Sequence, residues 1–509
     1  MNFKKISGAG LIALAGAILL TLVLSVPAAR VSYAQSPAAT SPAAAPAAPA
    51  APAAAAPATP PPPACDGTAN PPVLEKCTPN SGDTAWMLTS MAIVLMMTIP
   101  GLALFYGGMV RKKNVGDTVM TSFAITCLIS VLWLLFTYSL AFRSGTPFIG
   151  GLDRAFLQGM LSNTFNSAGV GLNIGNPNPL APTIPESVYS MFQLTFAIIT
   201  AALIAGSFAE RMKFSAMLWF IGLWAIFVYS PIAHWVWGPD GIFNSGNPNA
   251  KLHVLDFAGG TVVHVNSGTA GLMAALMVGK RKDTAPPHNM VLTMIGASLL
   301  WVGWFGFNAG SAVSAGMQAG MAMLVTHIAT ATAGFTWMIV EWMMRGKPTV
   351  IGICSGAVAG LVAITPASGF VKPFAGILIG FLAGVICFLM VTAVKSRFGY
   401  DDSLDAFGVH GIGGTLGALL TGVFATSAVN DGLKDASGKV LPLGWVDGQP
   451  GQVLNQAIAV LISWSMAIVG TLIILKICDA VLGVRASKEQ ELEGLDLSMH
   501  GEEGYNLEA

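Results

Sequence analysis

The sequence has very little charge for its length. Only 10% of its 509 residues are Asp, Glu, Lys or Arg, whereas 54% are hydrophobic, and the mean hydropathy is +0.66. So few charged side chains cannot supply the polar surface that a water-soluble protein of this size needs. The chain is therefore predicted to lie largely within a membrane.

The charge that is present has no excess of either sign. There are 25 basic and 25 acidic residues, and the basic ones fall mainly in short segments between apolar runs. A nucleic-acid-binding protein needs a continuous basic surface. Nucleic acid is therefore not an expected partner.

Cysteine is also scarce, with six residues in the chain. No CxxC pair or Cys/His cluster has the spacing of a zinc site, so no metal is expected. Four of the cysteines lie inside apolar runs and are predicted to be small buried residues. Cys65 and Cys77 flank a short polar segment, which a signal peptide would place outside the cytoplasm, where disulfides persist. A bridge and two separate thiols both fit this pair.

The N-terminus has the features of a secretory signal. Two lysines precede an apolar run, and the small-x-small motif Ser32-Tyr33-Ala34 follows it, which predicts a signal peptide over residues 1–34. An uncleaved first helix is the alternative, although the run is short for a membrane span. Residues 35–83 are rich in Ala and Pro and are predicted to form an extended, extracytoplasmic tether.

Apolar runs of about 20 residues, the length needed to cross the hydrocarbon layer, recur through the rest of the chain. Such spans must be helical, because lipid leaves open backbone groups unsatisfied and no alternating barrel pattern is present. We expect an all-α membrane domain over residues 84–484 and a cytoplasmic tail over residues 485–509. The eleven expected spans are 86–110, 117–142, 187–209, 214–237, 257–279, 289–309, 317–341, 349–367, 373–394, 405–425 and 453–482.

Basic residues in the short loops predict the orientation of these helices. Lys and Arg cluster after odd-numbered spans, as in Arg111-Lys112-Lys113 and Lys280-Arg281-Lys282. Loops enriched in Lys and Arg face the cytoplasm. The N-terminus is therefore expected outside and the C-terminus inside, in agreement with the signal peptide.

Two histidines lie deep in Gly-rich apolar segments of the fifth and tenth spans. Asp256 precedes His264, and Asp405 precedes His410. If spans one to five and six to ten are inverted repeats, followed by one final helix, the two histidines are related by symmetry and meet near the centre. A single buried histidine is more often a satisfied core residue, but a pair placed in this way favours a pore lining.

Aromatic residues provide a second signal. Phe192 and Phe196 lie one helical turn apart, Trp237 ends the fourth span, and Trp304 and Phe307 lie in the sixth. Such patterns usually mark a packed core or an interfacial belt. The nearby hydroxyl of Ser311 favours a site where a small cation meets aromatic faces.

At these positions the sequence closely resembles the ammonium transporter family (Amt/Mep/Rh), in particular its bacterial Amt-type channels. The resemblance covers roughly residues 84 to 506, and the tether lies outside it. The segments that carry it are Thr98-Ile99-Pro100-Gly101-Leu102-Ala103-Leu104-Phe105-Tyr106-Gly107-Gly108, Ser230-Pro231-Ile232-Ala233-His234, Asp256-Phe257-Ala258-Gly259-Gly260-Thr261-Val262-Val263-His264, Gly303-Trp304-Phe305-Gly306-Phe307-Asn308-Ala309-Gly310-Ser311 and Phe407-Gly408-Val409-His410-Gly411.

The resemblance implies a role for each of these residues. It implies an outer ammonium recruitment site, a stacked gate beneath it, a pore with twin histidines, and three residues that support the structure. The recruitment site would consist of Phe192, Trp237 and Ser311, and the gate of Phe196 and Phe307. The pore would contain His264, His410 and Trp304, and the supporting residues would be Asp256, Asp405 and Thr365.

The resemblance also implies the function and the partners. It implies a homotrimer in the cell inner membrane that recruits ammonium or methylammonium, deprotonates it and conducts ammonia into the cytoplasm. A cytoplasmic P-II-type nitrogen regulatory protein is an implied partner. The resemblance implies no catalytic residue and no cofactor for this chain. Two rival hypotheses are an ammonium sensor and a membrane enzyme with a histidine-bound metal. Two histidines without further ligands make a poor metal site.

Overall fold

The computed structural model describes residues 63–65, 79–160, 177–178, 180–434 and 438–505. The predicted signal peptide and most of the tether, including Cys77, lie outside the described residues. Cys65 is disulfide-bonded.

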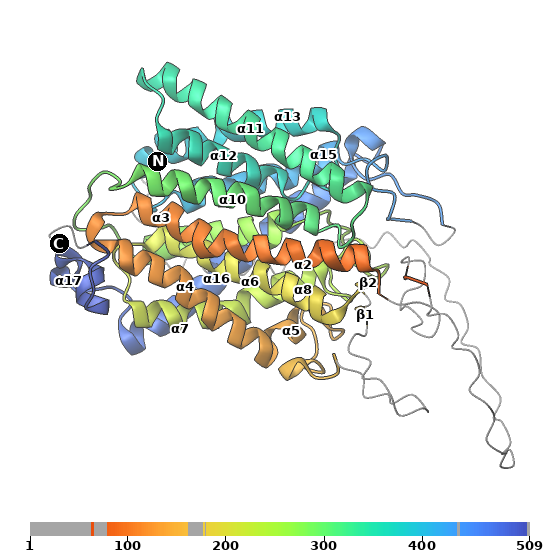
Figure 1. Cartoon of the computed structure of the whole chain (residues 1–509), viewed down its shortest axis with the longest axis horizontal. Coiled ribbons are helices and arrows are strands. Elements are labelled where there is room, and N and C mark those ends of the chain that lie inside the picture. Colours follow the sequence, from red (N-terminus) through yellow and green to blue (C-terminus); the bar gives the residue numbers. More distant parts are fainter. Residues whose placement is uncertain (1–62, 66–78, 161–176, 179, 435–437, 506–509) are drawn as a thin grey trace, which may run out of the picture.

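The described residues form a bundle of helices that run side by side along the long axis of Figure 1. In chain order they are α2 (Ser81–Met96), η2 (Met97–Leu102), α3 (Ala103–Met109), η3 (Lys112–Asn114), α4 (Val115–Leu132), η4 (Trp133–Thr137), α5 (Tyr138–Phe142), η5 (Ala155–Leu157), α6 (Glu186–Phe208), α7 (Phe214–Trp224), η6 (Ala225–Tyr229), α8 (Ser230–Trp237), η7 (Gly260–Val265), α9 (Asn266–Val278), α10 (Met290–Gly310), α11 (Met317–Arg345), α12 (Val350–Ile364), α13 (Pro373–Leu389), η8 (Met390–Val394), α14 (Lys395–Phe398), η9 (Phe407–Gly411), α15 (Ile412–Phe424), η10 (Trp445–Asp447), α16 (Gly451–Leu482), α17 (Lys488–Glu493) and η11 (Asp496–His500).

Ten helical segments within the described ranges are long and apolar enough to cross a membrane. They coincide with ten of the eleven spans expected from the sequence, so the all-helical membrane fold is confirmed. The other expected span, 349–367, corresponds to α12, an apolar helix of only 15 residues. It is shorter than expected because the chain leaves the helix at Thr365 and forms buried turns up to Phe370.

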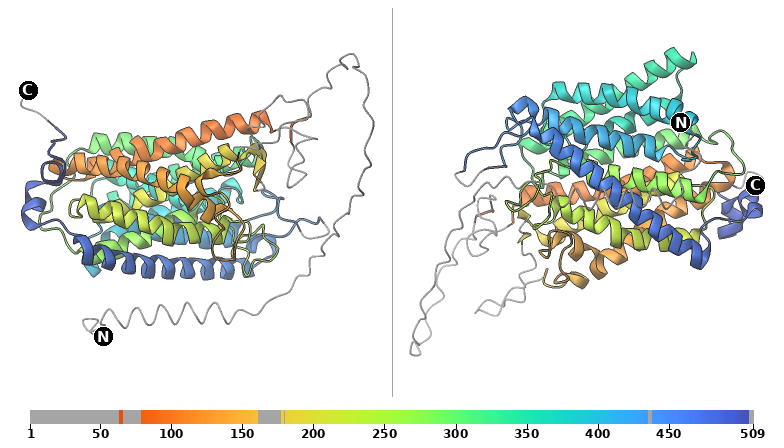
Figure 2. Two further views of the ribbon diagram at one scale, coloured as in Figure 1. Left: turned by 90° about the horizontal axis from the view of Figure 1, so that it is seen from below. Right: turned by 180° about the vertical axis from the view of Figure 1, so that it is seen from behind.

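The two ends of the bundle carry different structures. The short strands β1 (Pro177–Asn178) and β2 (Ala181–Pro185) pair antiparallel at one end, which we call the vestibule end. The C-terminal elements α17 and η11 lie at the opposite end, the tail end, in all three views of Figures 1 and 2.

The two histidine-bearing segments contact each other at a pair of glycines, Gly268 and Gly411. A Cβ atom on Gly268 of α9 would lie 2.1 Å from the backbone nitrogen of Gly411 at the end of η9. This distance is far shorter than any real contact, so glycine is required at position 268. The close approach brings the turns η7 and η9 together in the middle of the bundle.

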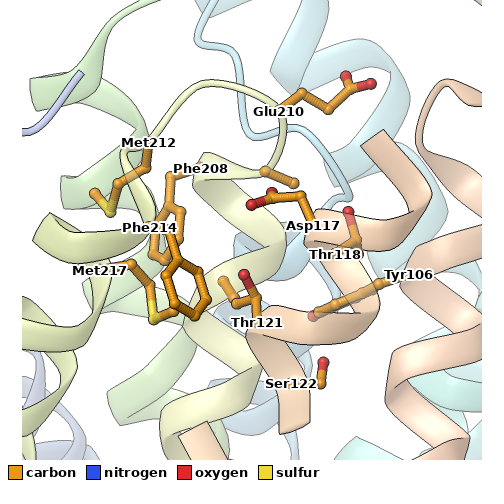
Figure 3. Close-up of a pocket in the computed structure, with 12 residues that line it drawn as sticks. Tyr106, Asp117, Thr118, Thr121, Ser122, Phe208, Glu210, Met212, Phe214 and Met217 are labelled. Carbon is orange, nitrogen blue, oxygen red and sulfur yellow. The ribbon is translucent and has the colours of Figure 1, made fainter. Parts of the chain in front are cut away.

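The C-terminal tail caps the start of α4. The carboxylate of Asp496 accepts hydrogen bonds from the backbone nitrogens of Gly116 (2.9 Å) and Asp117 (2.8 Å). A carboxylate at a helix N-terminus satisfies free N–H groups and favours the helix dipole. His500 Nε2 lies 3.1 Å from Asp117 Oδ1, and Asp117 also lines a small cavity of about 20 Å³ between α3, α4, α6 and α7 (Figure 3).

Docking of this tail is predicted to depend on pH through His500. The hydrogen bond with Asp117 raises the pKa of the His500 imidazole above its ordinary value; partial burial opposes this shift, and the negative charge of Asp117 adds to it. A raised pKa in the docked state stabilises docking below about pH 6.5, and this contribution is lost as the pH rises through the raised value. Hydrogen–deuterium exchange of residues 488–505, corrected for the intrinsic rate, should therefore become several-fold faster from about pH 6 to about pH 8.5.

The variant His500→Gln serves as the control, because glutamine keeps a donor for Asp117 but does not titrate. Its exchange should not change with pH beyond the intrinsic rate. Equal protection of the wild-type tail at both pH values, or the same loss in the variant, would contradict the prediction.

Candidate functional site

The aromatic and histidine residues singled out in the sequence come together in one row through the bundle. They come from five elements: α6 provides Phe192 and Phe196, α8 Trp237, α10 Trp304 and Phe307, η7 His264, and η9 His410. The centroid distances between neighbours along the row are 4.9 Å for Phe192–Phe196, 5.8 Å for Phe196–Trp237, 4.1 Å for Phe196–Phe307, 6.0 Å for Phe307–His264, 5.2 Å for His264–Trp304 and 5.3 Å for His264–His410.

The row begins at a cavity of about 310 Å³ at the vestibule end. Phe192, Trp237, Ser311 and Asp256 are among the residues that line this cavity, which we call the vestibule. The Ser311 hydroxyl donates a hydrogen bond to the carbonyl of Phe307 (2.8 Å), so its oxygen remains available as an acceptor. The cavity thus combines aromatic faces with a hydroxyl oxygen, which suits a small cation that can donate hydrogen bonds.

Phe196 lines the vestibule, and Phe307 lies between Phe196 and His264. Their rings stack at 4.1 Å with only 11° between the planes, and both side chains are fully buried. At this spacing no water molecule fits between the rings.

The two histidines face each other beneath the phenylalanines. His264 Nδ1 and His410 Nδ1 lie 3.3 Å apart, and the rings are inclined by 21°. Two facing ring nitrogens make a hydrogen bond only if one carries the proton and the other accepts it, so the tautomers of the pair are linked. His264 Nε2 has no partner in the described part of the chain, which leaves it free for one further hydrogen bond.

Trp304 and Thr365 fix the orientation of His264. The indole of Trp304 stacks on the His264 ring at 18° between planes, and its Nε1 donates to the Thr365 hydroxyl (2.8 Å). Thr365 Oγ1 in turn lies 2.7 Å from the carbonyl of Leu361, to which it donates. All of these groups are buried, so the histidine is held by packing and not by a charged partner.

Asp256 joins the vestibule to the histidine turn. Its carboxylate accepts four backbone hydrogen bonds at the start of η7, from Gly259, Gly260, Thr261 and Val262, at 2.6–3.2 Å. Its backbone carbonyl accepts the indole N–H of Trp237 (2.9 Å). With both carboxylate oxygens occupied, Asp256 stabilises the site geometry and has no free oxygen for a substrate.

Asp405 does not play the part at η9 that Asp256 plays at η7. Asp402 does so instead. Asp405 is partly exposed and forms an ion pair with Lys395 at 2.6 Å. Asp402 is 1% exposed, and its carboxylate accepts the backbone N–H of Phe407 (2.7 Å) at the start of η9. Asp402 precedes His410 by eight residues, the spacing between Asp256 and His264. This equal spacing was the signal in the sequence that could have found Asp402.

Comparisons with known proteins identify the family of the chain. Residues 85–505 match the model of the Ammonium Transporter Family. The chain is 48% identical over 426 residues to an ammonium transporter of Bacillus subtilis, covering 83% of this chain and 98% of the relative. It is 40% identical to the ammonium transporter Amt1 of Archaeoglobus fulgidus, covering 84% of this chain and 100% of that protein.

Solved structures with the same fold are also known. The crystal structure of Candida albicans Mep2 is similar with a TM-score of 0.71 and 33% identity, covering 81% of this chain and 88% of that one. The family model spans most of the chain, and the relatives are matched over nearly their full length. The chain therefore belongs to the Ammonium Transporter Family, a family of transporters and not of enzymes.

Proposed function

We propose that this protein transports ammonium: it recruits the cation at the vestibule, removes a proton there, and conducts ammonia past His264 and His410. The observation that carries the proposal is the buried row from Phe192 to His410, which has a cation-compatible cavity at its start and no Asp, Glu, Lys or Arg side chain among its members. Such a row suits a neutral polar molecule much better than an ion.

Magnitudes favour ammonia as the species that crosses. Moving an ammonium-sized ion into dry, low-dielectric surroundings costs on the order of 20 kcal/mol before any compensation. Removing its proton costs about 1.4 kcal/mol per pKa unit, or roughly 4 kcal/mol for the three units between a lysine-like pKa near 10 and neutral pH. Deprotonation is therefore the route with the lower barrier.

The vestibule residues suit recruitment of the cation before that step. Trp237 and Phe192 offer π faces, to which an ammonium ion is attracted, and the Ser311 oxygen accepts one of its N–H donors. The stacked rings of Phe196 and Phe307 then exclude water from the passage beneath. A hydrated ion has to leave its water in the vestibule.

The histidines suit the handling of ammonia inside. Neutral imidazole offers one donor and one acceptor, and ammonia is itself both a donor and an acceptor. His264 Nε2, without a partner among the described residues, is the group that we assign to this contact. The linked tautomers of the pair fix which nitrogen donates and which accepts.

We extend the proposal to the setting of the protein. The vestibule end faces the outside and the tail end the cytoplasm, since Arg111, Lys113 and Arg281 lie in the loops packed at the tail end. With α12 as the eighth of eleven spans, the chain forms two inverted five-helix repeats and a final helix. Residues 1–34 act as a signal peptide, residues 35–83 as a tether, and the domain assembles as a homotrimer in the inner membrane, with a P-II-type protein as its cytoplasmic partner.

The double variant His264→Ala/His410→Ala tests the role of the histidines. Without imidazole groups, the passage offers ammonia no hydrogen-bond partner, so methylammonium uptake by reconstituted protein should fall by at least about tenfold. His253→Ala, which changes a histidine outside the row, is the control and should transport normally. Unchanged uptake and ammonium selectivity in the double variant would refute the assignment of the histidines.

The variant Trp237→Leu tests recruitment at the vestibule. Loss of a partly desolvated cation–π contact of about 1 kcal/mol should raise the half-saturation concentration for methylammonium about fivefold. The matched control is Trp219→Leu, because Trp219 lies on α7 with 62% of its surface exposed, far from the row. The same concentration dependence in Trp237→Leu and in the wild type would count against recruitment by this aromatic face.

A further inference from the structure

A third histidine, His234, is fully buried near the vestibule but does not belong to the row. It lies in the last turn of α8, three residues before Trp237. Its Nδ1 lies 3.1 Å from the carbonyl oxygen of Ala141, and its Nε2 lies 2.8 Å from the carbonyl oxygen of Thr146. Both ring nitrogens therefore face backbone oxygens.

This environment offers only acceptors. A carbonyl oxygen cannot donate, and a neutral imidazole carries a single N–H, so the neutral ring can satisfy only one of the two contacts. In the other contact, a nitrogen lone pair faces an oxygen lone pair at hydrogen-bonding distance. Only the protonated ring, with an N–H on both nitrogens, satisfies both carbonyls at once.

The ring has no room to turn away from these oxygens. A Cβ atom on Gly238 would lie 2.3 Å from His234 Nδ1, so the chain passes directly against the imidazole. Gly238 also donates its backbone N–H to the carbonyl of His234 (2.9 Å). The position of the imidazole is fixed by the backbone on both sides.

His234 joins the end of α8 to the segment 141–150. Three more hydrogen bonds connect the same two parts of the chain, along a contact that we call the seam. Trp235 Nε1 donates to Phe148 O (2.9 Å), Ile242 N donates to Pro147 O (3.2 Å) and Gly145 N donates to Asp240 (2.9 Å). The His234 contacts are the only ones of these four connections whose strength changes with protonation near neutral pH.

The seam leads directly to the recruitment residue. Trp237 is the last residue of α8, and its indole reaches across the vestibule to the carbonyl of Asp256. A displacement of the α8 end therefore moves the indole relative to Phe196 and Ser311, which lie in other elements.

We propose that His234 is a positioning residue that makes ammonium recruitment depend on the pH at the vestibule side. Uptake of a proton supplies the second N–H, tightens the α8 end against segment 141–150 and holds Trp237 in its binding position. This inference rests on the proposed recruitment role of Trp237. It adds regulation of recruitment by a residue outside the row.

The charges around the ring are consistent with proton uptake. Burial of the ring is the largest influence on its protonation and opposes the charge, whereas the carbonyls of Thr146 and Ala141 and the negative charge of Asp240, on the segment after α8, favour the imidazolium. The ring also lies in the last turn of a helix, where the helix dipole favours a positive charge. Acidification on the vestibule side should therefore strengthen the contact between the end of α8 and segment 141–150, and rising pH should weaken it.

The test measures the half-saturation concentration for methylammonium uptake in proteoliposomes at several external pH values between about 5 and 8. Methylammonium, with a lysine-like pKa near 10, remains protonated over this range, so its own titration does not contribute. In the wild type, half-saturation should rise about threefold as the external pH rises. The variant His234→Gln keeps one donor without titrating, and its half-saturation should be independent of pH.

The control is His253→Gln, which replaces another histidine of the vestibule end, with Nδ1 3.3 Å from a single carbonyl, that of Ser245. This variant should keep the wild-type pH profile. A wild-type pH dependence that persists in His234→Gln would overturn the proposal. If the wild type shows no saturable uptake at all, the proposed function fails instead.

A second measurement applies even if His234→Gln does not fold. Nitrogen NMR of the histidine-labelled wild type should show His234 with protons on both ring nitrogens at about pH 5 and on one at about pH 8. A single protonated nitrogen at both ends of that range would overturn the proposal.

Discussion

The proposed passage depends on one constraint, the high cost of placing an ion in surroundings without water. The row from Phe196 to His410 contains aromatic rings and two imidazoles, and its stacked phenylalanines lie between the vestibule and the histidines. Under the proposed function, such a group of donors and acceptors suits ammonia better than its conjugate acid. The proposed function therefore separates recognition of the cation, in the vestibule, from conduction of the neutral molecule, past the histidines.

The scaffold meets this constraint by bringing two helix starts together inside the bundle. In each half, an aspartate eight residues before the histidine caps the start of the histidine turn: Asp256 accepts four backbone N–H groups at η7, and Asp402 accepts one, from Phe407, at η9. Gly268 then allows α9 to contact η9 backbone to backbone. The aspartates thus stabilise the starts of the two histidine turns, while the row itself contains no Asp, Glu, Lys or Arg side chain.

The sequence predicted much of the fold because apolar length is a strong signal in a membrane protein. The spans 187–209 and 214–237 differ from α6 and from the segment Phe214–Trp237 by at most one residue at either end. The first span was expected to begin at 86 but begins at Ser81, because the Asn80 side chain caps α2. Hydropathy does not register such a cap.

The candidate site was less predictable wherever it depends on three-dimensional proximity. Motifs located the histidines and aromatics, but spacing alone could not give the 3.3 Å contact between Nδ1 atoms, which requires the glycine contact between η9 and α9. Asp405 attracted attention because it stands nearer to His410 in the chain than Asp402 does. The two carbonyls around His234 come from residues about 90 positions earlier in the chain, so no local pattern could show them.

The most direct test of the account is a comparison of ammonium with potassium, a cation of similar size that has no proton to lose. Flux of both ions would be measured on the same reconstituted protein, with ammonium pulses and with radioactive rubidium as a tracer for potassium. A dry passage that requires deprotonation predicts ammonium-dependent transport with no protein-dependent rubidium flux. Rubidium flux comparable to that of ammonium would mean that ions cross intact, and it would contradict the central claim.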